Sequence, residues 1–219
     1  MVAGLPNLGP KSAELLSLAG ITTEAQLDEL GPVRSYVRCV LAGNVSKVML
    51  YALLGAELQL HWNEVPTDIR AAALEESTAR LRAAQEGLLH IMSSTEWAAV
   101  GDQYLPDSLH KEGFIHCSTR RTVLGPANTL YAGRSGLVVL EIEADRVPDH
   151  ILFEDSYGAG IEYPHIYGPL PKDAVVGVVD FPSEPDGSFR LPASLTRLKR
   201  PIRSTYCLTS CRSRSTSSV

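Results

Sequence analysis

Apolar residues in the first third of the chain recur at helical spacing, and glycine or proline interrupts them. The pattern predicts two short helices that end at Gly20 and Gly31, and further apolar helices over 36–41 and 45–60. Residues 69–85 are polar and rich in alanine, which favours a helix even without a clear apolar face. The first third is therefore predicted to be all α.

Beyond Glu86 the pattern changes to short runs of β-branched and aromatic residues bounded by Gly, Pro or Asp, which is typical of strands. These runs occupy residues 88–92, 113–117, 136–144 and 174–181. The stretch "YPHIY" contains Pro164, which cannot donate to a ladder, so it is predicted to be an edge strand or a strand-like loop. Helix-like segments between the runs make this half α+β.

Beyond Pro182 the periodicity ends, and residues 190–219 hold seven Lys or Arg and no acidic residue. A segment this polar cannot bury a core, so a disordered basic tail is expected. The chain is accordingly predicted to be multi-domain. Its parts are a small all-α domain at 1–70, a helical connector at 71–87, an α+β domain at 88–185 and the tail at 186–219.

Both parts that are expected to fold are acidic. Residues 1–76 carry five basic against nine acidic residues, and residues 85–185 carry six against fifteen. Nucleic-acid binding depends on neutralising phosphates, so this balance disfavours strong DNA binding. No signal-peptide pattern opens the chain, no apolar run is long enough to cross a bilayer, and the four cysteines fit no disulfide framework. A cytoplasmic protein with no membrane partner is expected.

The segment "LPNLGPKSAELLSLAGI", residues 5–21, resembles the hairpin and second helix of a helix-hairpin-helix element. Residues 5–70 as a whole resemble the C-terminal domain of the competence regulator TfoX. In such a hairpin Gly9 lets backbone N–H groups approach a phosphate and Lys11 adds charge, so these are the candidate nucleic-acid contacts. Because the block is acidic, a protein-interaction or structural role is favoured over DNA binding.

The second half contains, in order, the motifs "GFIHCST", "GLVVLEIEADRV" and "EYPHIYGP". Over residues 88–181 the chain is similar to the domain-of-unknown-function 952 family, which is placed among the ADP-ribosyltransferase-like folds. The resemblance implies a split α/β sheet around a cleft of the size of NAD. It implies no particular reaction.

The stretch "GFIHCSTRR" places His116 on the same face of a strand as Phe114 and Ser118, which is typical of a pocket wall. Ser118 or Thr119 can cap the helix that follows. The first turn of that helix then holds Arg120 and Arg121. Cations at a helix start oppose the helix dipole, so they indicate either a bound phosphate or carboxylate or an acidic neighbour.

The stretch "EYPHIYG" repeats the alternation, with Tyr163, His165 and Tyr167 on one side. Two histidines among aromatic rings can hold a ribose and stack a flat base or nicotinamide, and Tyr131 or Glu154 can complete that pocket. The candidate ligand-binding residues are therefore Ser118, Thr119, Arg120, Arg121, Tyr163 and Tyr167.

The family resemblance implies roles for some of these residues. In ADP-ribosyltransferase-like enzymes a strand histidine holds a ribose hydroxyl and a tyrosine stacks the nicotinamide, roles that fall to His116 and Tyr131. His165 stands where the enzymes' acid is expected, although imidazole stabilises an oxocarbenium less than a carboxylate does. Either Glu154 or Glu162 supplies the acid, or the chemistry differs, or catalysis is absent. The candidate catalytic residues are His116, His165, Glu154 and Tyr131.

Two functions remain open. In the first, the α+β domain binds a nucleotide or NAD-type ligand, with NAD as candidate cofactor, and any reaction is ADP-ribosyl or related ribose-phosphate transfer. Residues 1–70 then recruit a protein partner. In the second, the chain is a non-enzymatic regulatory adaptor and its histidines only stabilise the core. The histidines and cysteines form no short-spaced ligand pair, so no metal site is expected.

Overall fold

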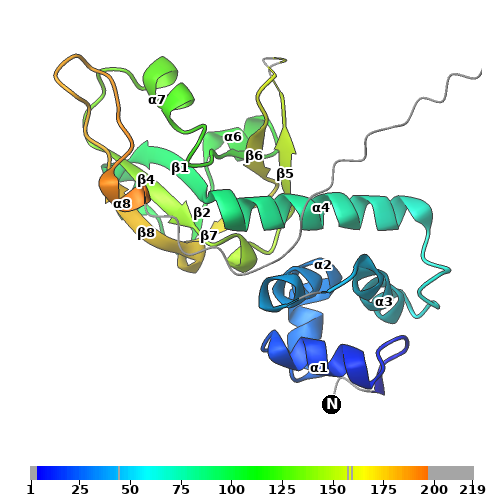
Figure 1. Cartoon of the computed structure of the whole chain (residues 1–219). Helices are drawn as coiled ribbons and strands as arrows, with labels where there is room; N and C mark the ends of the chain where they lie inside the picture. The colour runs from blue at the N-terminus through cyan, green and yellow to red at the C-terminus, as the bar shows by residue number, and fades with distance from the viewer. Residues whose placement is uncertain (1–3, 44, 157, 159, 197–219) are drawn as a thin grey trace, which may run out of the picture.

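The computed structural model describes residues 4–43, 45–156, 158 and 160–196. A bundle of helices is followed by a long helix and then by antiparallel sheets with short helices around them (Figure 1). The predicted multi-domain order, all-α and then α+β, is confirmed. The finer assignment to a split sheet of the ADP-ribosyltransferase type stays a prediction. Within the described ranges, no helix combines the length and the apolar character needed to cross a membrane.

Three helices around a leucine-rich core make up the first part. They are α1 (Pro10–Leu18), α2 (Glu24–Ala42) and α3 (Lys47–Leu58). Thr23 and Gln26 form a capping box that fixes the start of α2. As the pattern predicts, the helical conformation is interrupted at Gly31, whose φ of 69° and ψ of 174° are not helical. A second helical segment begins directly after it at Pro32, so α2 consists of two helices joined by a kink.

Helix α4 (Thr67–Glu86) packs on both halves of the molecule. Ala73 belongs to the core of the helical part, whereas Ala83 belongs to a core beneath the sheets. In Figure 1 the helix lies between α2 and α3 on one side and the sheets on the other. The segment predicted to be a connector is therefore a structural element that both cores share.

Arg80 on α4 is the largest fully buried side chain, with 1% of it exposed. Its Nε donates to Glu76 at 2.8 Å, and its Nη1 donates to the carbonyls of Ala144 and Val147 at 2.9 Å each. Nη2 donates to the carbonyl of Asp149 at 2.6 Å. A guanidinium in a fixed fork geometry thus holds the segment that precedes β5 against α4.

The second part contains three antiparallel sheets and several short helices. One sheet has the order β1 (Leu88–Ser93), β4 (Leu137–Ile142), β8 (Val175–Asp180); a second has the order β3 (Ile115–His116), β6 (Tyr163–Ile166), β5 (Ile151–Glu154). The third pairs β2 (Gln103–Tyr104) with β7 (Leu170–Pro171). The helices are α5 (Ser94–Ala99), α6 (Asp107–Lys111), α7 (Leu124–Leu130), η2 (Ala144–Arg146), η3 (Lys172–Ala174) and α8 (Ala193–Thr196). A bridge between Leu89 and Ser118 connects the first two sheets.

Pro164 lies in β6, the central strand of its sheet, and the expectation of an edge strand or loop was wrong. The carbonyl of Pro164 accepts from the N–H of Cys117. The N and C=O of one residue point to the same side of a strand, so the missing N–H also faces β3. The β3 ladder ends at His116, and the lost donor therefore falls just beyond it.

Strands β1 and β4 of the first sheet are buried on both faces, which explains their nearly continuous apolar sequences. Strand β8 alternates instead and exposes Val176 and Val178. Leu88 and Met92 pack toward the second sheet, whereas Leu89 and Ile91 pack toward α7 and the segment after β8. That segment provides three buried side chains, Phe181, Phe189 and Leu195.

The predicted tail therefore starts too early. Residues 186–196 belong to the fold, because their aromatic and leucine side chains cover a sheet face that would otherwise meet water. The rest of the predicted tail, residues 197–219, lies outside the described residues.

Replacing Phe189 with Ala should lower the free energy of unfolding by about 3–5 kcal/mol, because a fully buried phenyl ring is removed from a packed core. Urea denaturation measures the change, and Ser194→Ala, at an exposed position of α8, is the control with no expected effect. Equal stability of the two variants would show that residues 186–196 do not contribute to the core.

Replacing Arg80 with Met should destabilise the protein by about 3–5 kcal/mol, because Glu76 and three carbonyls lose their buried donor. Arg82→Met on the same helix is the matched control. Arg82 pairs with Glu162 and Glu86 and lies over the ring of Phe153, but its side chain is 35% exposed. Its replacement should therefore cost less than that of Arg80, about 1–2 kcal/mol. Similar losses in both variants would contradict a special role for Arg80.

Candidate functional site

Two histidines that are far apart in the sequence face each other across neighbouring strands. His116 on β3 is the register partner of His165 on β6, and their ring centroids lie 5.3 Å apart in an edge-to-face arrangement. The ring of Phe114 stacks on His165 at 4.1 Å and meets the edge of His116 at 4.9 Å. Tyr167 completes this aromatic group, with its ring 5.5 Å from that of Phe114.

Each histidine has its own carboxylate. Nδ1 of His165 donates to Oε2 of Glu154 at 3.0 Å, and the hydroxyl of Tyr167 donates to the same oxygen at 2.5 Å. Nε2 of His116 lies 3.0 Å from Oε2 of Glu112. We call these six residues the histidine cluster: Glu112, Phe114, His116, Glu154, His165 and Tyr167.

The two histidines differ in exposure. The side chain of His116 is 36% exposed, while that of His165 is 1% exposed. Burial lowers the pKa of His165, and this outweighs the hydrogen bond to Glu154, which acts in the opposite direction. His165 is therefore neutral near pH 7 with its proton on Nδ1. Its Nε2 is buried and has no hydrogen-bond partner in the part of the chain that the structure describes.

Glu154 remains accessible and ionised. Burial tends to raise the pKa of Glu154, but the hydrogen bonds from Tyr167 and His165 together lower it below the ordinary value. Burial and the adjacent carboxylate raise the pKa of Tyr167 to about 12, so that its hydroxyl keeps its proton. With 39% of the Glu154 side chain exposed, the cluster presents a fixed negative charge at the surface.

A third histidine supports the backbone of His116 from beneath. Nδ1 of His90 donates to the carbonyl of His116 at 2.7 Å, and its Nε2 lies 3.4 Å from the hydroxyl of Tyr104. That hydroxyl in turn donates to Glu96 at 3.2 Å. Burial lowers the pKa of His90 to about 4. His90 therefore acts as a neutral hydrogen-bonding residue of the core.

The structure thus brings together four of the predicted site residues, His116, His165, Glu154 and Tyr167. Tyr131 is not among them. Its ring packs against the core beneath α7, and the guanidinium of Arg134 lies over it. Of the two candidate acids, Glu154 joins the cluster, whereas Glu162 pairs with Arg82 on α4.

The arginines expected to bind an anion are used differently. Arg120 forms an ion pair with Glu141 at 2.6 Å and donates to the carbonyl of Leu195, so the acidic-neighbour alternative applies to it. Arg121 is exposed and stands in a turn before α7 begins. Of the four predicted ligand residues in this stretch, Arg121 alone keeps an accessible charged group.

Ser118 and Thr119 are buried. Ser118 makes the bridge to β1 through its backbone, and Thr119 builds the turn by accepting from the N–H of Arg121 and pairing with Thr122. Tyr163 extends toward α7, with its hydroxyl beside Gly125. These three side chains shape the fold around the cluster and do not join it.

Two contributors were missed by the sequence reasoning, Glu112 and His90. Glu112 stands four residues before His116 but follows a short helix, so no strand or helix period connects the two. His90 sits in the apolar run "LLHIM", where a single histidine gives no functional indication. A carboxylate supplied from outside the strands, or a buried imidazole, is recognised as a partner only when the strands are paired.

The candidate nucleic-acid residues lie in the other half. Gly9 is the N-cap of α1 and Lys11 is exposed in its first turn. The first turn of α1 holds no acidic residue, and the acidic balance belongs to residues 1–76 as a whole. Weak DNA binding stays a prediction.

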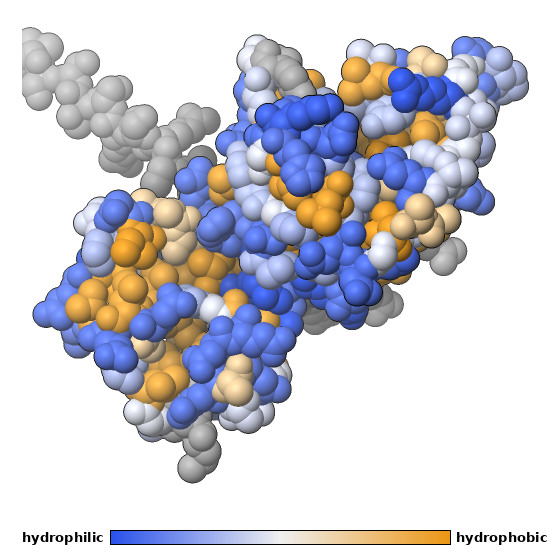
Figure 2. All heavy atoms as spheres, turned by 180° about the vertical axis from the view of Figure 1, so that it is seen from behind, coloured by the Kyte–Doolittle hydropathy of each residue, from blue (hydrophilic) through white to orange (hydrophobic). Residues whose placement is uncertain are grey.

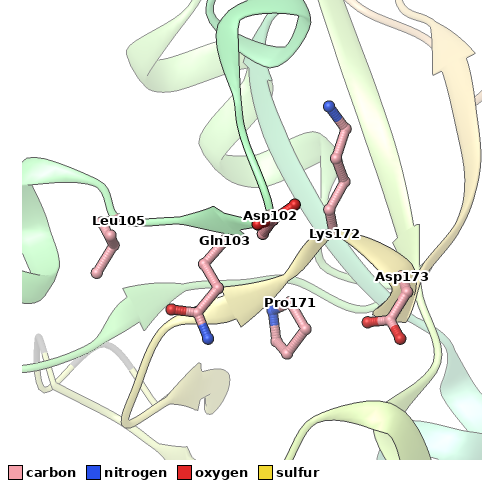
Figure 3. Close-up of a pocket in the computed structure, with 6 residues that line it drawn as sticks. All are labelled: Asp102, Gln103, Leu105, Pro171, Lys172 and Asp173. Carbon is pink, nitrogen blue, oxygen red and sulfur yellow. The ribbon is translucent and has the colours of Figure 1, made fainter.

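An open depression of about 860 Å³ lies at the β2–β7 pair, lined by Asp102, Gln103 and Lys172 among others (Figure 3). Nζ of Lys172 donates to the carbonyl of Val100 at 2.5 Å and lies over the ring of Trp97. None of the predicted site residues lines this depression. Within the described ranges, no group of three or more His, Cys, Asp or Glu is placed to hold a metal ion.

Because the pKa of His90 is lowered from 6.5 to about 4, its contribution to stability is present above pH 6.5 and is lost as the pH falls toward 4. Wild-type protein should lose on the order of 2 kcal/mol more than His90→Gln when the pH falls from about 6.5 to about 5. Denaturation curves at several pH values measure this. Parallel pH dependences of the two proteins would contradict the assignment.

Comparisons with known proteins identify both halves. The family model for the TfoX C-terminal domain matches residues 1–77, and the model described as "Protein of unknown function (DUF952)" matches residues 91–178. The crystal structure of protein CC0527 from Caulobacter crescentus is 28% identical, covers 50% of this chain and 97% of its own, and gives a TM-score of 0.46. Its solution NMR structure is 24% identical, covers 51% and 97%, and gives 0.41. No curated protein matches the chain. The chain therefore carries a TfoX C-terminal domain followed by a domain of the DUF952 family.

Proposed function

We propose that the histidine cluster binds the ribose of a nucleotide or NAD-type ligand and supports ADP-ribosyl transfer from it. The supporting observation is the carboxylate of Glu154, which is partly exposed and held ionised by Tyr167 and His165. A carboxylate in this state can stabilise the positive charge that develops at the C1′ atom of a ribose. By the family resemblance, His165 stands where such an acid is expected. In this proposal Glu154, which is hydrogen-bonded to His165, serves as the acid.

His116 is the ligand-facing histidine of the proposed site. Its partly exposed imidazole can exchange hydrogen bonds with a ribose hydroxyl, while His90 fixes its backbone from below. The aromatic surface for a flat ring is provided by Phe114 and Tyr167, which are half-buried, and not by Tyr131. The buried His165 positions Glu154.

The proposed reaction breaks the N-glycosidic bond of NAD. Nicotinamide leaves with the bonding electron pair, and Glu154 stabilises the resulting oxocarbenium. The oxygen of an acceptor hydroxyl or of water forms the new bond to C1′, and its proton passes to Glu154 or to solvent. Because Arg120 is paired with Glu141, the ligand's phosphates meet at most Arg121, and recognition rests on the ribose and the ring.

A non-enzymatic adaptor is the second candidate, and one observation favours it. Each histidine of the cluster already has a carboxylate partner inside the fold, as expected of residues that only stabilise the structure. The two functions differ in the quantity that a substitution at His116 changes.

If the cluster binds ligand, NAD, ADP-ribose, a nucleotide or a ribose phosphate should raise the melting temperature of the full chain. A ligand at about a hundred times its Kd adds about 2.7 kcal/mol. His116→Gln should abolish the increase while keeping the stability of the free protein, since the side chain is partly exposed. Released nicotinamide, measured with NAD alone, tests the reaction separately.

His61→Gln is the matched control, because His61 is exposed in the helical part and far from the cluster in sequence. It should leave the ligand response unchanged. No response to any of the ligands, together with a loss of several kcal/mol of stability in His116→Gln, would refute the binding proposal and leave the adaptor function.

A further inference from the structure

The helical part carries a groove at the kink of α2. Its volume is about 270 Å³, and its apolar lining includes Leu5, Leu27 and Leu53. Leu27 and Leu53, core residues that are 7% and 2% exposed, line the groove, and we call them its floor. Gly31 and Pro32 line one wall, so the groove exists because α2 changes direction there.

Acceptor groups surround this apolar floor. The exposed carboxylates of Asp28 and Glu57 line the groove from α2 and α3. Burial and, secondarily, the charge of Asp28 raise the pKa of Glu57, so the two carboxylates repel each other. Across the described ranges, neither carboxylate has an ion-pair partner.

The backbone adds to the negative potential. Pro32 has no N–H, so the carbonyl of Asp28 loses the donor that a regular helix would provide. The last turn of α3, which contains Glu57, carries no basic residue, and its helix dipole is negative at this end. The kink in α2, the C-terminal end of α3 and the carboxylates of Asp28 and Glu57 all make the groove electronegative. Such a groove favours a cationic group.

The helical part as a whole presents a surface that fits a macromolecule better than a free cation. The helical part exposes several large apolar side chains, and Figure 2 shows apolar patches on this part of the molecule at the lower left. These side chains are Leu18, Val48, Leu58, Leu60, Trp62 and Leu74. The carboxylates of Asp28 and Glu57 repel DNA and anionic membranes. A basic amphipathic segment can instead place apolar side chains on Leu27 and Leu53 and a cation near the two carboxylates.

We propose that this groove is the docking site for a basic amphipathic helix of a protein partner, with an apolar side chain on Leu27 and Leu53 and a Lys or Arg between Asp28 and Glu57. The proposal gives the TfoX-like domain a recognition surface of defined chemistry. It does not depend on ligand binding by the histidine cluster.

The test uses the full chain and a fluorescein-labelled helical peptide of about 18 residues with Leu at i, i+3, i+4 spacing and Lys elsewhere. Anisotropy should show saturable binding that weakens with salt. Asp28→Lys/Glu57→Lys should weaken it by more than about tenfold, because two attractive contacts become repulsive. The control Asp68→Lys/Glu75→Lys makes the same charge change at exposed positions of α4 and should weaken binding less than about threefold.

A second variant, Ala56→Leu, fills the groove from α3 without changing charge and should also weaken binding while the melting temperature is kept. Three results would overturn the proposal. They are equal loss in the two double variants, equal binding of a peptide with Ser in place of Leu, and displacement of the peptide by duplex DNA. The last would make the surface a nucleic-acid site.

Discussion

The arrangement of the two halves depends on one buried guanidinium. A charge removed from water is tolerated only when nearly all its donors are used, and Arg80 uses its donors on Glu76 and on three carbonyls of the segment at 144–149. Arg34 and Arg38 of α2 hold the same segment through the carbonyl and carboxylate of Asp145. Helices α2 and α4 thus both bind one short segment of the α+β part, which fixes the orientation of the helical part against it.

That segment leads directly into the candidate site. Strand β5 begins two residues after Asp149, and it ends at Glu154, the carboxylate that holds His165. Strand β5 pairs with β6, and β6 pairs with β3. Because Arg80 fixes the residues that lead into β5, it also affects where β3 and His116 lie. Through this segment the helical part helps to set the position of β5, so a substitution at Arg80 is expected to change the geometry of the cluster.

The sequence predicted the fold where local patterns decide it. Period and caps locate most helices, and apolar runs locate β1, β4 and β8. It failed where tertiary contacts decide. Pro164 is tolerated in a central strand because the β3 ladder beside it ends at His116. Residues 186–196 are ordered because their apolar side chains pack on a face of the first sheet. In the site, strand alternation brought out His116, His165 and Tyr167. Partners supplied across strands or from loops, such as Glu112, required the folded chain.

The two motifs that look alike in the sequence do different things in the structure. His165 is buried, neutral and bonded to Glu154, so its role is to hold a carboxylate in place. His116 occupies the opposite register position but remains partly exposed, and its main chain is fixed by His90. A site needs both kinds of residue, because an accessible group binds with precision only when a rigid neighbour fixes it. The histidine in the apolar strand is therefore best explained as the accessible half of this pair.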